Sequence, residues 1–124
     1  MISRFGGDDF AVYAGSERFL LDTLRAGGAG CISATANVNP VAIVEAARRY
    51  REEGADDRQE ALNEVRGLFE AYPLIPAMKA VTAHFSGEPG WRRVRPPLVE
   101  LDSAGEDLLV SSLTRNGFRM AGLR

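Results

Sequence analysis

Short apolar segments alternate with polar, glycine-rich connections along this chain, and their spacing predicts two strands near the start. The first segment, FAVYA at residues 10–14, is aromatic and β-branched, which is typical of a buried strand that ends at Gly15. The second, GCISATA at residues 30–36, has no long polar side chain. That composition indicates a strand covered on both faces.

A helix is predicted between these strands. Ser16 suits its N-cap, Phe19, Leu20 and Leu24 fall on one helical face, and Gly27 supplies a left-handed stop. Two strands joined by a helix through short loops form a βαβ unit, whose crossover makes the strands parallel. We therefore expect a parallel pair.

The rest of the chain is predicted to be helical. Asn39 and Pro40 form an N-cap and a favoured first-turn proline, for a helix that runs to about Glu53. Asp56 or Asp57 is expected to cap the next helix, which follows the helical period.

Two further helices are expected near the C-terminus. One starts at Pro76 and runs to about Phe85, and a loop rich in turn residues follows. Ser103 and Glu106 have the spacing of a capping box for the last helix. Two strands with this many helices leave unpaired sheet edges, so the chain is predicted to be part of a larger sheet.

Composition excludes several classes of function. The 124 residues carry 15 Lys and Arg against 17 Asp and Glu, a balance that argues against nucleic-acid binding. No apolar run approaches the ~20 residues of a membrane span, and the start lacks the order of a secretory signal, so the cytoplasm is expected. One cysteine and one histidine provide no ligand set for zinc, and neither a metal nor a cofactor is predicted.

Four segments, in order, resemble the C-terminal part of the dihydrodipicolinate synthase / N-acetylneuraminate lyase family. They are AGSE at residues 14–17, GGAGCISATANVNP at 27–40, PLIPAMK at 73–79 and VRPPL at 94–98. Together they span most of the chain, and their order and spacing make the resemblance specific.

The resemblance implies a fold and a place for the site. Members of this family are (β/α)8 TIM barrels with extra C-terminal helices, so the chain is expected to be an α/β partial barrel. Residues 1–53 would be the last two βα units, and residues 54–124 a C-terminal helical subdomain. Active sites of such barrels lie at the C-terminal strand ends. This implies that Gly15 and Ile32 line a substrate site without carrying protons.

The resemblance also implies a chemistry. The family is composed of lyases and synthases that act on pyruvate and other 2-oxo acids through a Schiff base with a lysine on the sixth strand. That lysine, a tyrosine proton shuttle and a Thr-Thr pair would all precede Met1. We therefore expect no catalytic residue in this chain and no activity alone. The expected partners are the 2-oxo acid and either further copies of the chain or the missing N-terminal part of the barrel.

Three reactive side chains have simpler interpretations. Lys79, the only lysine, lies in a predicted helix and is expected to be a packing residue. His84 has no nucleophile or paired carboxylate at a recognisable spacing, so a helix-end residue is expected. Cys31 lies inside the second strand as a small filler. The basic and aromatic residues 91–95 are interpreted as a solvated loop or subunit contact.

Two alternatives to the lyase interpretation stay open on the sequence. The chain could be a non-catalytic interaction or oligomerisation module that pairs its strand edges with another chain. It could also be a small independent α/β domain that binds an anion where Gly15 and Ser16 lead into a helix.

Overall fold

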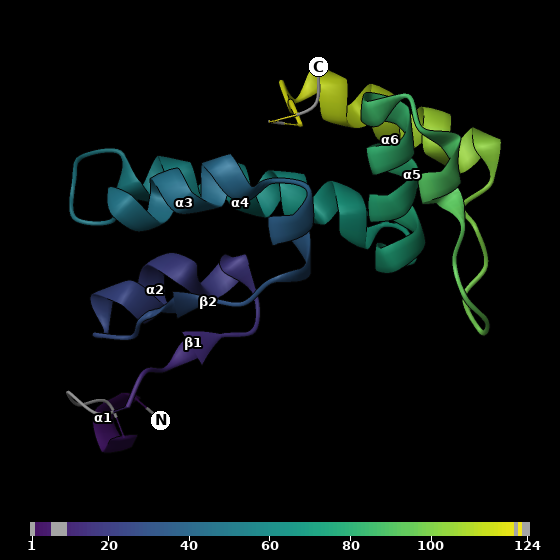
Figure 1. Cartoon of the computed structure of the whole chain (residues 1–124). Helices are drawn as coiled ribbons and strands as arrows, with labels where there is room; N and C mark the ends of the chain where they lie inside the picture. Colours follow the sequence, from purple (N-terminus) through teal and green to yellow (C-terminus); the bar gives the residue numbers. More distant parts are fainter. Residues whose placement is uncertain (1, 6–9, 121, 123–124) are drawn as a thin grey trace. The chain divides into compact units, whose positions relative to one another are not determined.

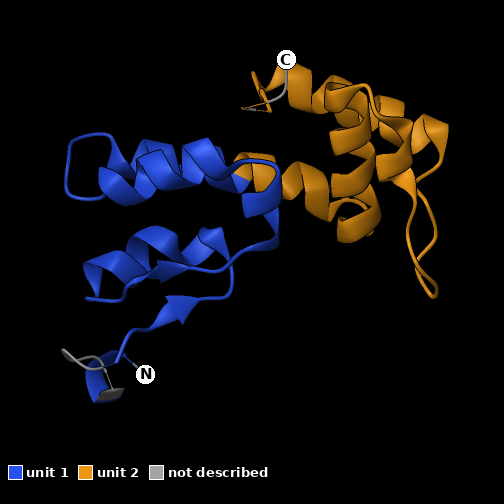
Figure 2. Ribbon diagram, in the orientation of Figure 1, with its two compact units in different colours: residues 1–63 blue, residues 64–124 orange. Residues whose placement is uncertain are grey.

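The computed structural model describes residues 2–5, 10–120 and 122 (Figure 1). Residues 6–9, in the segment compared with a secretory signal, lie outside the described residues. The chain divides into two compact units, Met1–Asn63 and Glu64–Arg124 (Figure 2). The predicted domain boundary at residues 53 and 54 stays a prediction. No helix in the described ranges is long and apolar enough to cross a membrane.

The first unit contains the predicted parallel strand pair. It begins with a short helix, α1 (Ile2–Phe5). Strands β1 (Tyr13–Ala14) and β2 (Gly30–Cys31) pair in parallel, with Tyr13 opposite Gly30 and Ala14 opposite Cys31 (Figure 1). The Ile32 N–H donates to the Ala14 carbonyl at 2.9 Å, which continues the ladder by one step. The parallel pairing is confirmed, but both strands are shorter than predicted.

The second predicted strand is wrong beyond its first residues. Instead of extending to residue 36, the chain turns into a 3₁₀ helix, η2 (Ala34–Asn37). Backbone hydrogen bonds from Ala36 to Ser33 and from Val38 to Thr35 close this turn. The Ser33 and Thr35 hydroxyls donate to the carboxylate of Glu17, and these side-chain bonds stabilise the turned conformation.

The connection between the strands is helical, as predicted. It consists of a 3₁₀ turn, η1 (Glu17–Phe19), and helix α2 (Leu20–Arg25). The Ser16 side chain caps η1 by accepting from the Arg18 N–H, and Gly27 ends the connection at φ +88°. Phe19 does not share a face with Leu20 as predicted, since Phe19 is 59% exposed and Leu20 only 2%. A 3₁₀ turn has three residues per turn, so Phe19 leaves the face that an α-helix would give it.

Helices α3 (Pro40–Arg48) and α4 (Ala55–Glu70) follow. Pro40 begins α3 as predicted, but the helix ends before the expected Glu53, and α4 starts one residue ahead of Asp56. Asp56 therefore lies in the first turn, where a carboxylate complements the helix dipole. The core of this unit is formed by residues from α2, α3 and α4: Leu20, Ile43, Ala46 and Leu62.

The second unit is helical in its described part. Helix α5 (Leu74–Ser86) is followed by a 3₁₀ turn, η3 (Pro89–Arg92), and helix α6 (Ser103–Arg115). The Phe118 ring lies edge-on to Phe69 and Phe85, with centroids 6.1 and 5.8 Å away. Fully buried side chains, among them Val81, Leu109 and Leu113, complete this core.

The predicted capping box of the last helix is wrong. Asp102 is the N-cap, and its carboxylate accepts from the Gly105 N–H at 2.7 Å. The buried Glu106 carboxylate instead binds the Arg92 guanidinium through two hydrogen bonds of 2.7 and 2.5 Å. A bidentate bond to a cation is stronger than a bond to a neutral backbone amide, and it holds the end of η3 to α6.

We expect Glu106→Ala to lower the free energy of unfolding by about 2 kcal/mol, because Arg92 loses its charged partner and a buried site is emptied. Urea denaturation followed by circular dichroism would measure this change. The matched control is the exposed neighbour Asp107→Ala, for which a change under about 0.5 kcal/mol is expected. Equal effects of both substitutions would contradict the assigned role of the ion pair.

Candidate functional site

The two residues expected to line a site lie at the same edge of the strand pair. Gly15 directly follows β1 and Ile32 directly follows β2, and parallel pairing places the carboxyl ends of both strands together. The bond from the Ile32 N–H to the Ala14 carbonyl, 2.9 Å long, fixes this neighbourhood. We call Gly15, Ile32 and their backbone the strand-end edge.

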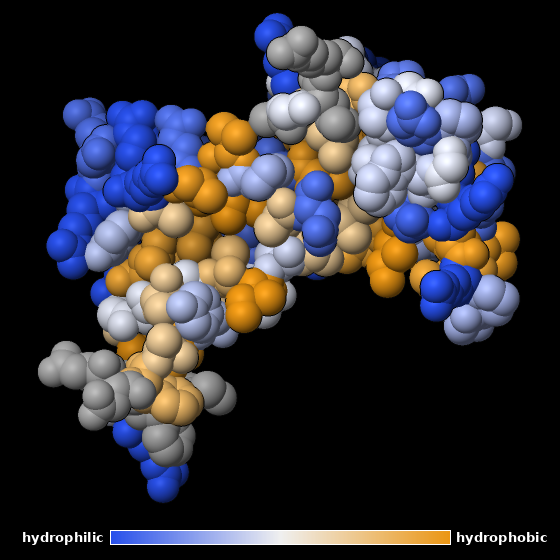
Figure 3. All heavy atoms as spheres, viewed as in Figure 1, coloured by the Kyte–Doolittle hydropathy of each residue, from blue (hydrophilic) through white to orange (hydrophobic). Residues whose placement is uncertain are grey.

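The strand-end edge is open within the described part of the chain. Ile32 is 74% exposed, and a Cβ placed on Gly15 would meet no atom within 4 Å beyond its chain neighbours. Phe10 and Tyr13, before and within β1, are also about half exposed, at 55% and 51%. Figure 3 shows hydrophobic residues, in orange, at several places on the molecular surface. A large exposed apolar side chain such as that of Ile32, beside an open glycine, is a feature of binding surfaces.

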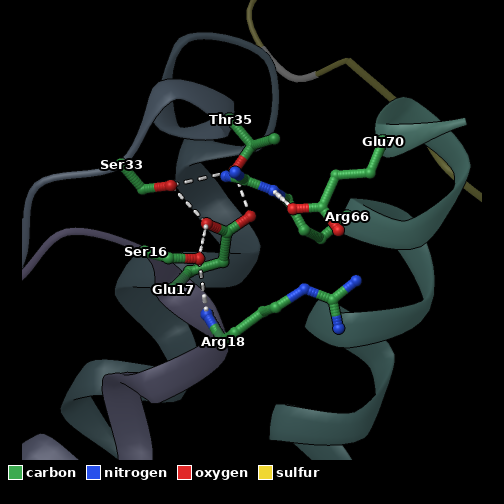
Figure 4. A network of polar contacts seen from close by, with 7 residues as sticks. All are labelled: Ser16, Glu17, Arg18, Ser33, Thr35, Arg66 and Glu70. Carbon is green, nitrogen blue, oxygen red and sulfur yellow. Dashed lines mark hydrogen bonds and ion pairs between the residues drawn. The ribbon is translucent and has the colours of Figure 1, made fainter. Parts of the chain in front are cut away.

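A buried carboxylate lies directly beside this edge. Glu17 is 2% exposed, and three hydroxyl groups donate to it, those of Ser16, Ser33 and Thr35 (Figure 4). Thr35 is itself only 1% exposed. Burial of a carboxylate is costly unless its oxygens accept hydrogen bonds, and these hydroxyls supply them. We call these four residues the Glu17 cluster.

Gln59 on α4 fixes the backbone around Glu17. Its side-chain amide donates to the Glu17 carbonyl and accepts from the Leu21 N–H, each at 2.9 Å. The same amide group donates to Asn63 at 3.0 Å. The start of the connection between the strands is therefore held by a side chain from a helix distant in sequence.

Sequence reasoning missed the Glu17 cluster. The signal that could have indicated it is an acidic residue two positions after Gly15, combined with the Ser-x-Thr pattern directly after Ile32. Such hydroxyl and carboxyl residues at neighbouring strand ends can bind one another across a parallel pair. A strand interpretation of residues 30–36 concealed the pattern.

Cys31 does not have the surroundings of a reactive thiol. The side chain is half-buried in β2, and burial raises the pKa of its thiol, as does the negative charge of Glu17. A raised pKa reduces the thiolate, which is the nucleophilic form. These surroundings agree with the expectation that Cys31 is a small packing residue of the second strand.

Lys79 and His84 belong to helix α5 in the second unit. The Lys79 ammonium lies 5.3 Å from the centroid of the Trp91 ring, a cation–π contact. His84 is exposed and packs edge-on against Phe85, with centroids 5.2 Å apart. In the described ranges, no three His, Cys, Asp or Glu side chains gather as metal ligands. Neither Lys79 nor His84 is thus placed beside a recognisable catalytic partner.

Comparison with known proteins identifies the family. The sequence profile of the Dihydrodipicolinate synthetase family matches residues 2–116. The chain belongs to this family. A 4-hydroxy-tetrahydrodipicolinate synthase of Thermoanaerobacter sp. (strain X514) is 33% identical over 121 residues. The match covers 94% of this chain but 39% of that protein, so the chain spans about two fifths of the length of such dihydrodipicolinate synthase relatives.

Solved structures of the dihydrodipicolinate synthase family share the fold. The dihydrodipicolinate synthase of Agrobacterium tumefaciens is 30% identical and aligns with a TM-score of 0.70 over 90% of this chain and 36% of its own. A prophage protein of this family from E. coli K12, solved in complex with pyruvate, is 25% identical with a TM-score of 0.76, over 89% of this chain and 38% of its own. The predicted fold class, the last two βα units of a TIM barrel with C-terminal helices, is confirmed.

We expect the rate of reaction with iodoacetamide to rise with pH in both the folded chain and the chain unfolded in urea. The midpoint of this rise should lie at higher pH in the folded chain. The reason is that the pKa of Cys31, the single cysteine, is raised by burial and by Glu17, so less thiolate is present at a given pH. Mass spectrometry of the labelled fraction would measure both curves. Glu17→Gln should move the folded curve back toward lower pH, and a folded curve at or below the unfolded one would contradict the assignment.

Proposed function

We propose that this chain forms part of the substrate site of a lyase or synthase that acts on pyruvate or another 2-oxo acid through a Schiff base. The observation that carries the proposal is the strand-end edge. Gly15 and Ile32 lie together and open at the carboxyl ends of two parallel strands, in a chain of the dihydrodipicolinate synthase family. That end of a TIM barrel is where active sites are found.

In this proposal Gly15 and Ile32 bind and shape but transfer no proton. The missing side chain of Gly15 leaves room for the small ligand to approach the backbone. The exposed Ile32 side chain supplies an apolar wall beside the carbon skeleton of the 2-oxo acid. The E. coli relative was solved in complex with pyruvate, which supports this substrate class.

The amine of the Schiff base is proposed to come from outside these 124 residues. A lysine amine adds to the ketone and water leaves, and the resulting protonated imine withdraws electrons from the neighbouring carbon. Lys79 is the only lysine in the sequence, and it lies in α5 against the Trp91 ring. The proton-shuttling tyrosine and the threonines that bind the carboxylate are likewise proposed to lie outside this sequence.

We further propose that the working protein is a cytoplasmic homo-oligomer. Val41 and Val44 on α3 are 58% and 45% exposed, and together with Glu45 and Arg48 they line a surface groove. Apolar side chains with a charged rim are typical of subunit contacts.

A second candidate function, a non-catalytic interaction module, is favoured by one observation. Among the described residues the sheet has two strands, so one side of each strand has no neighbouring strand. Unpaired strand sides can add a strand from another chain. In this alternative the strand-end edge binds protein and no imine is formed.

We expect no borohydride-trapped adduct when the chain alone is incubated with pyruvate. A chimera can be made in which the full chain replaces the matching C-terminal part of the Thermoanaerobacter synthase. This chimera should give a stoichiometric adduct. The adduct should lie on a lysine contributed by the synthase, because Lys79 lies in the helical second unit. Intact mass and peptide mapping would locate it.

Two outcomes of this experiment would contradict the proposed function. An adduct on Lys79 would assign the chemistry to this chain. A folded chimera without any adduct, combined with a chain that forms stable dimers in light scattering, would favour the interaction module.

We expect Gly15→Val in the chimera to raise the pyruvate concentration for half-maximal adduct by about tenfold, because the new side chain occupies ligand space. Thermal unfolding should stay unchanged, since a Cβ at Gly15 meets open space. Gly90→Val is the matched control, a glycine with equally open surroundings in the second unit.

Ile32→Ala in the chimera should weaken pyruvate binding as well, whereas Leu108→Ala, at a similarly exposed residue, should not. Equal responses in each pair would contradict the assignment of the edge.

A further inference from the structure

We propose that Glu17 is a positioning residue, whose buried carboxylate joins the loops after β1 and β2 and thereby sets the spacing of Gly15 and Ile32. The inference rests on the proposed function for its consequence, the binding of the 2-oxo acid. Its structural part, the joining of the two loops, can be tested on the chain itself.

Two partners of the carboxylate directly follow the residues of the strand-end edge. The Ser16 hydroxyl donates to Glu17 Oε2 at 3.4 Å, and Ser16 is the residue after Gly15. The Ser33 hydroxyl donates to the same oxygen, and Ser33 is the residue after Ile32. The Glu17 carboxylate is therefore bound to the loops that continue from both members of the edge.

Glu17 is itself held in a fixed position. Thr35, the buried second residue of the turn η2, donates to the other carboxylate oxygen, Oε1. The Glu17 carbonyl accepts from Gln59 at 2.9 Å. Both ends of the Glu17 residue are thus bound, and a side chain held in this way can hold the loops that bind to it. Figure 4 shows Ser16, Ser33 and Thr35 directed toward the carboxylate.

Burial separates positioning by Glu17 from contact with substrate. Glu17 is 2% exposed, so its carboxylate has little surface to offer a ligand, whereas Ile32 is 74% exposed. Glu17 therefore acts through its neighbours. The backbone ladder ends at the bond between Ile32 and Ala14, and the Glu17 cluster joins the chain just beyond that point.

The two acceptor oxygens of the Glu17 side chain are the property on which this role depends. A carboxylate accepts hydrogen bonds on both oxygens, whereas a glutamine side chain accepts on one and donates from the other. Glu17→Gln keeps the size of the side chain but reverses part of the hydrogen-bonding pattern. Thr35→Val keeps the shape and removes one donor, and Thr35→Ser keeps the donor.

The first part of the test uses the full chain and hydrogen exchange measured by NMR. Glu17→Gln and Thr35→Val should speed exchange of the Ile32 amide by about tenfold relative to amides of α3 in the same unit. Thr35→Ser keeps the hydroxyl donor, so exchange of the Ile32 amide should stay as slow as in the unsubstituted chain. The matched control is Glu106→Gln, a buried carboxylate in the second unit, which should leave the Ile32 amide unchanged relative to α3. Equal acceleration of Ile32 and α3 amides would overturn the proposal, because it would indicate general destabilisation.

The second part uses the chimera with the Thermoanaerobacter synthase. Glu17→Gln should raise the pyruvate concentration for half-maximal adduct by about tenfold, with the final adduct yield unchanged. Thr35→Ser should behave like the parent. Glu106→Gln should leave the pyruvate concentration for half-maximal adduct within about twofold, since the partner of Glu106 is Arg92 in the second unit.

The outcomes distinguish the two proposals. A folded parent chimera without an adduct contradicts the proposed function. The hydrogen-exchange data then test only whether Glu17 joins the two loops. A parent that forms the adduct, with Glu17→Gln indistinguishable from it, overturns the positioning role. If the chimera does not fold, unchanged Ile32 exchange in the Glu17→Gln chain overturns the proposal and faster exchange supports it.

Discussion

Parallel pairing of β1 with β2 is the constraint on which the first unit depends. Parallel strands must be joined by a crossover, and here the residues between them form η1 and α2, whose Leu20 contributes to the core. The same pairing places both carboxyl strand ends at one edge, where the loops after the strands meet. The site, the helical connection and the core of this unit thus follow from one arrangement of two short strands.

The Glu17 cluster shows how the chain accommodates a charge at the end of that pair. A buried carboxylate without hydrogen-bond partners would destabilise the fold, because the free energy of removing it from water is large. In the structure, hydroxyls of Ser33 and Thr35 donate to the Glu17 carboxylate, and the Gln59 amide on α4 donates to the Glu17 backbone carbonyl. The chain leaves β2 after Cys31 and turns into η2, and this turn directs Ser33 and Thr35 to the carboxylate.

The sequence predicted the features that depend on neighbouring residues. Ser16 caps the first turn, Gly27 takes a left-handed conformation, Pro40 begins α3, and the four family segments identified the fold. It did not predict bonds between residues far apart in the chain. Glu17 and Thr35 are 18 positions apart, and no local period connects them. For the same reason Glu106 was assigned to its own helix terminus, whereas its partner Arg92 lies 14 positions earlier.

The distance in sequence between contacting residues has a consequence for the order in which the chain folds. Helix α5 packs against the turn η3 that directly follows it, so this contact closes only a short segment of chain. The ring contact between Phe69 and Phe118 joins residues that are 49 positions apart, and it requires the whole intervening segment to be closed first. Local contacts form faster than non-local ones. The packing of α5 against η3 is therefore expected to form early, and the contact of Phe118 with Phe69 to be among the last parts of the second unit to reach its final arrangement.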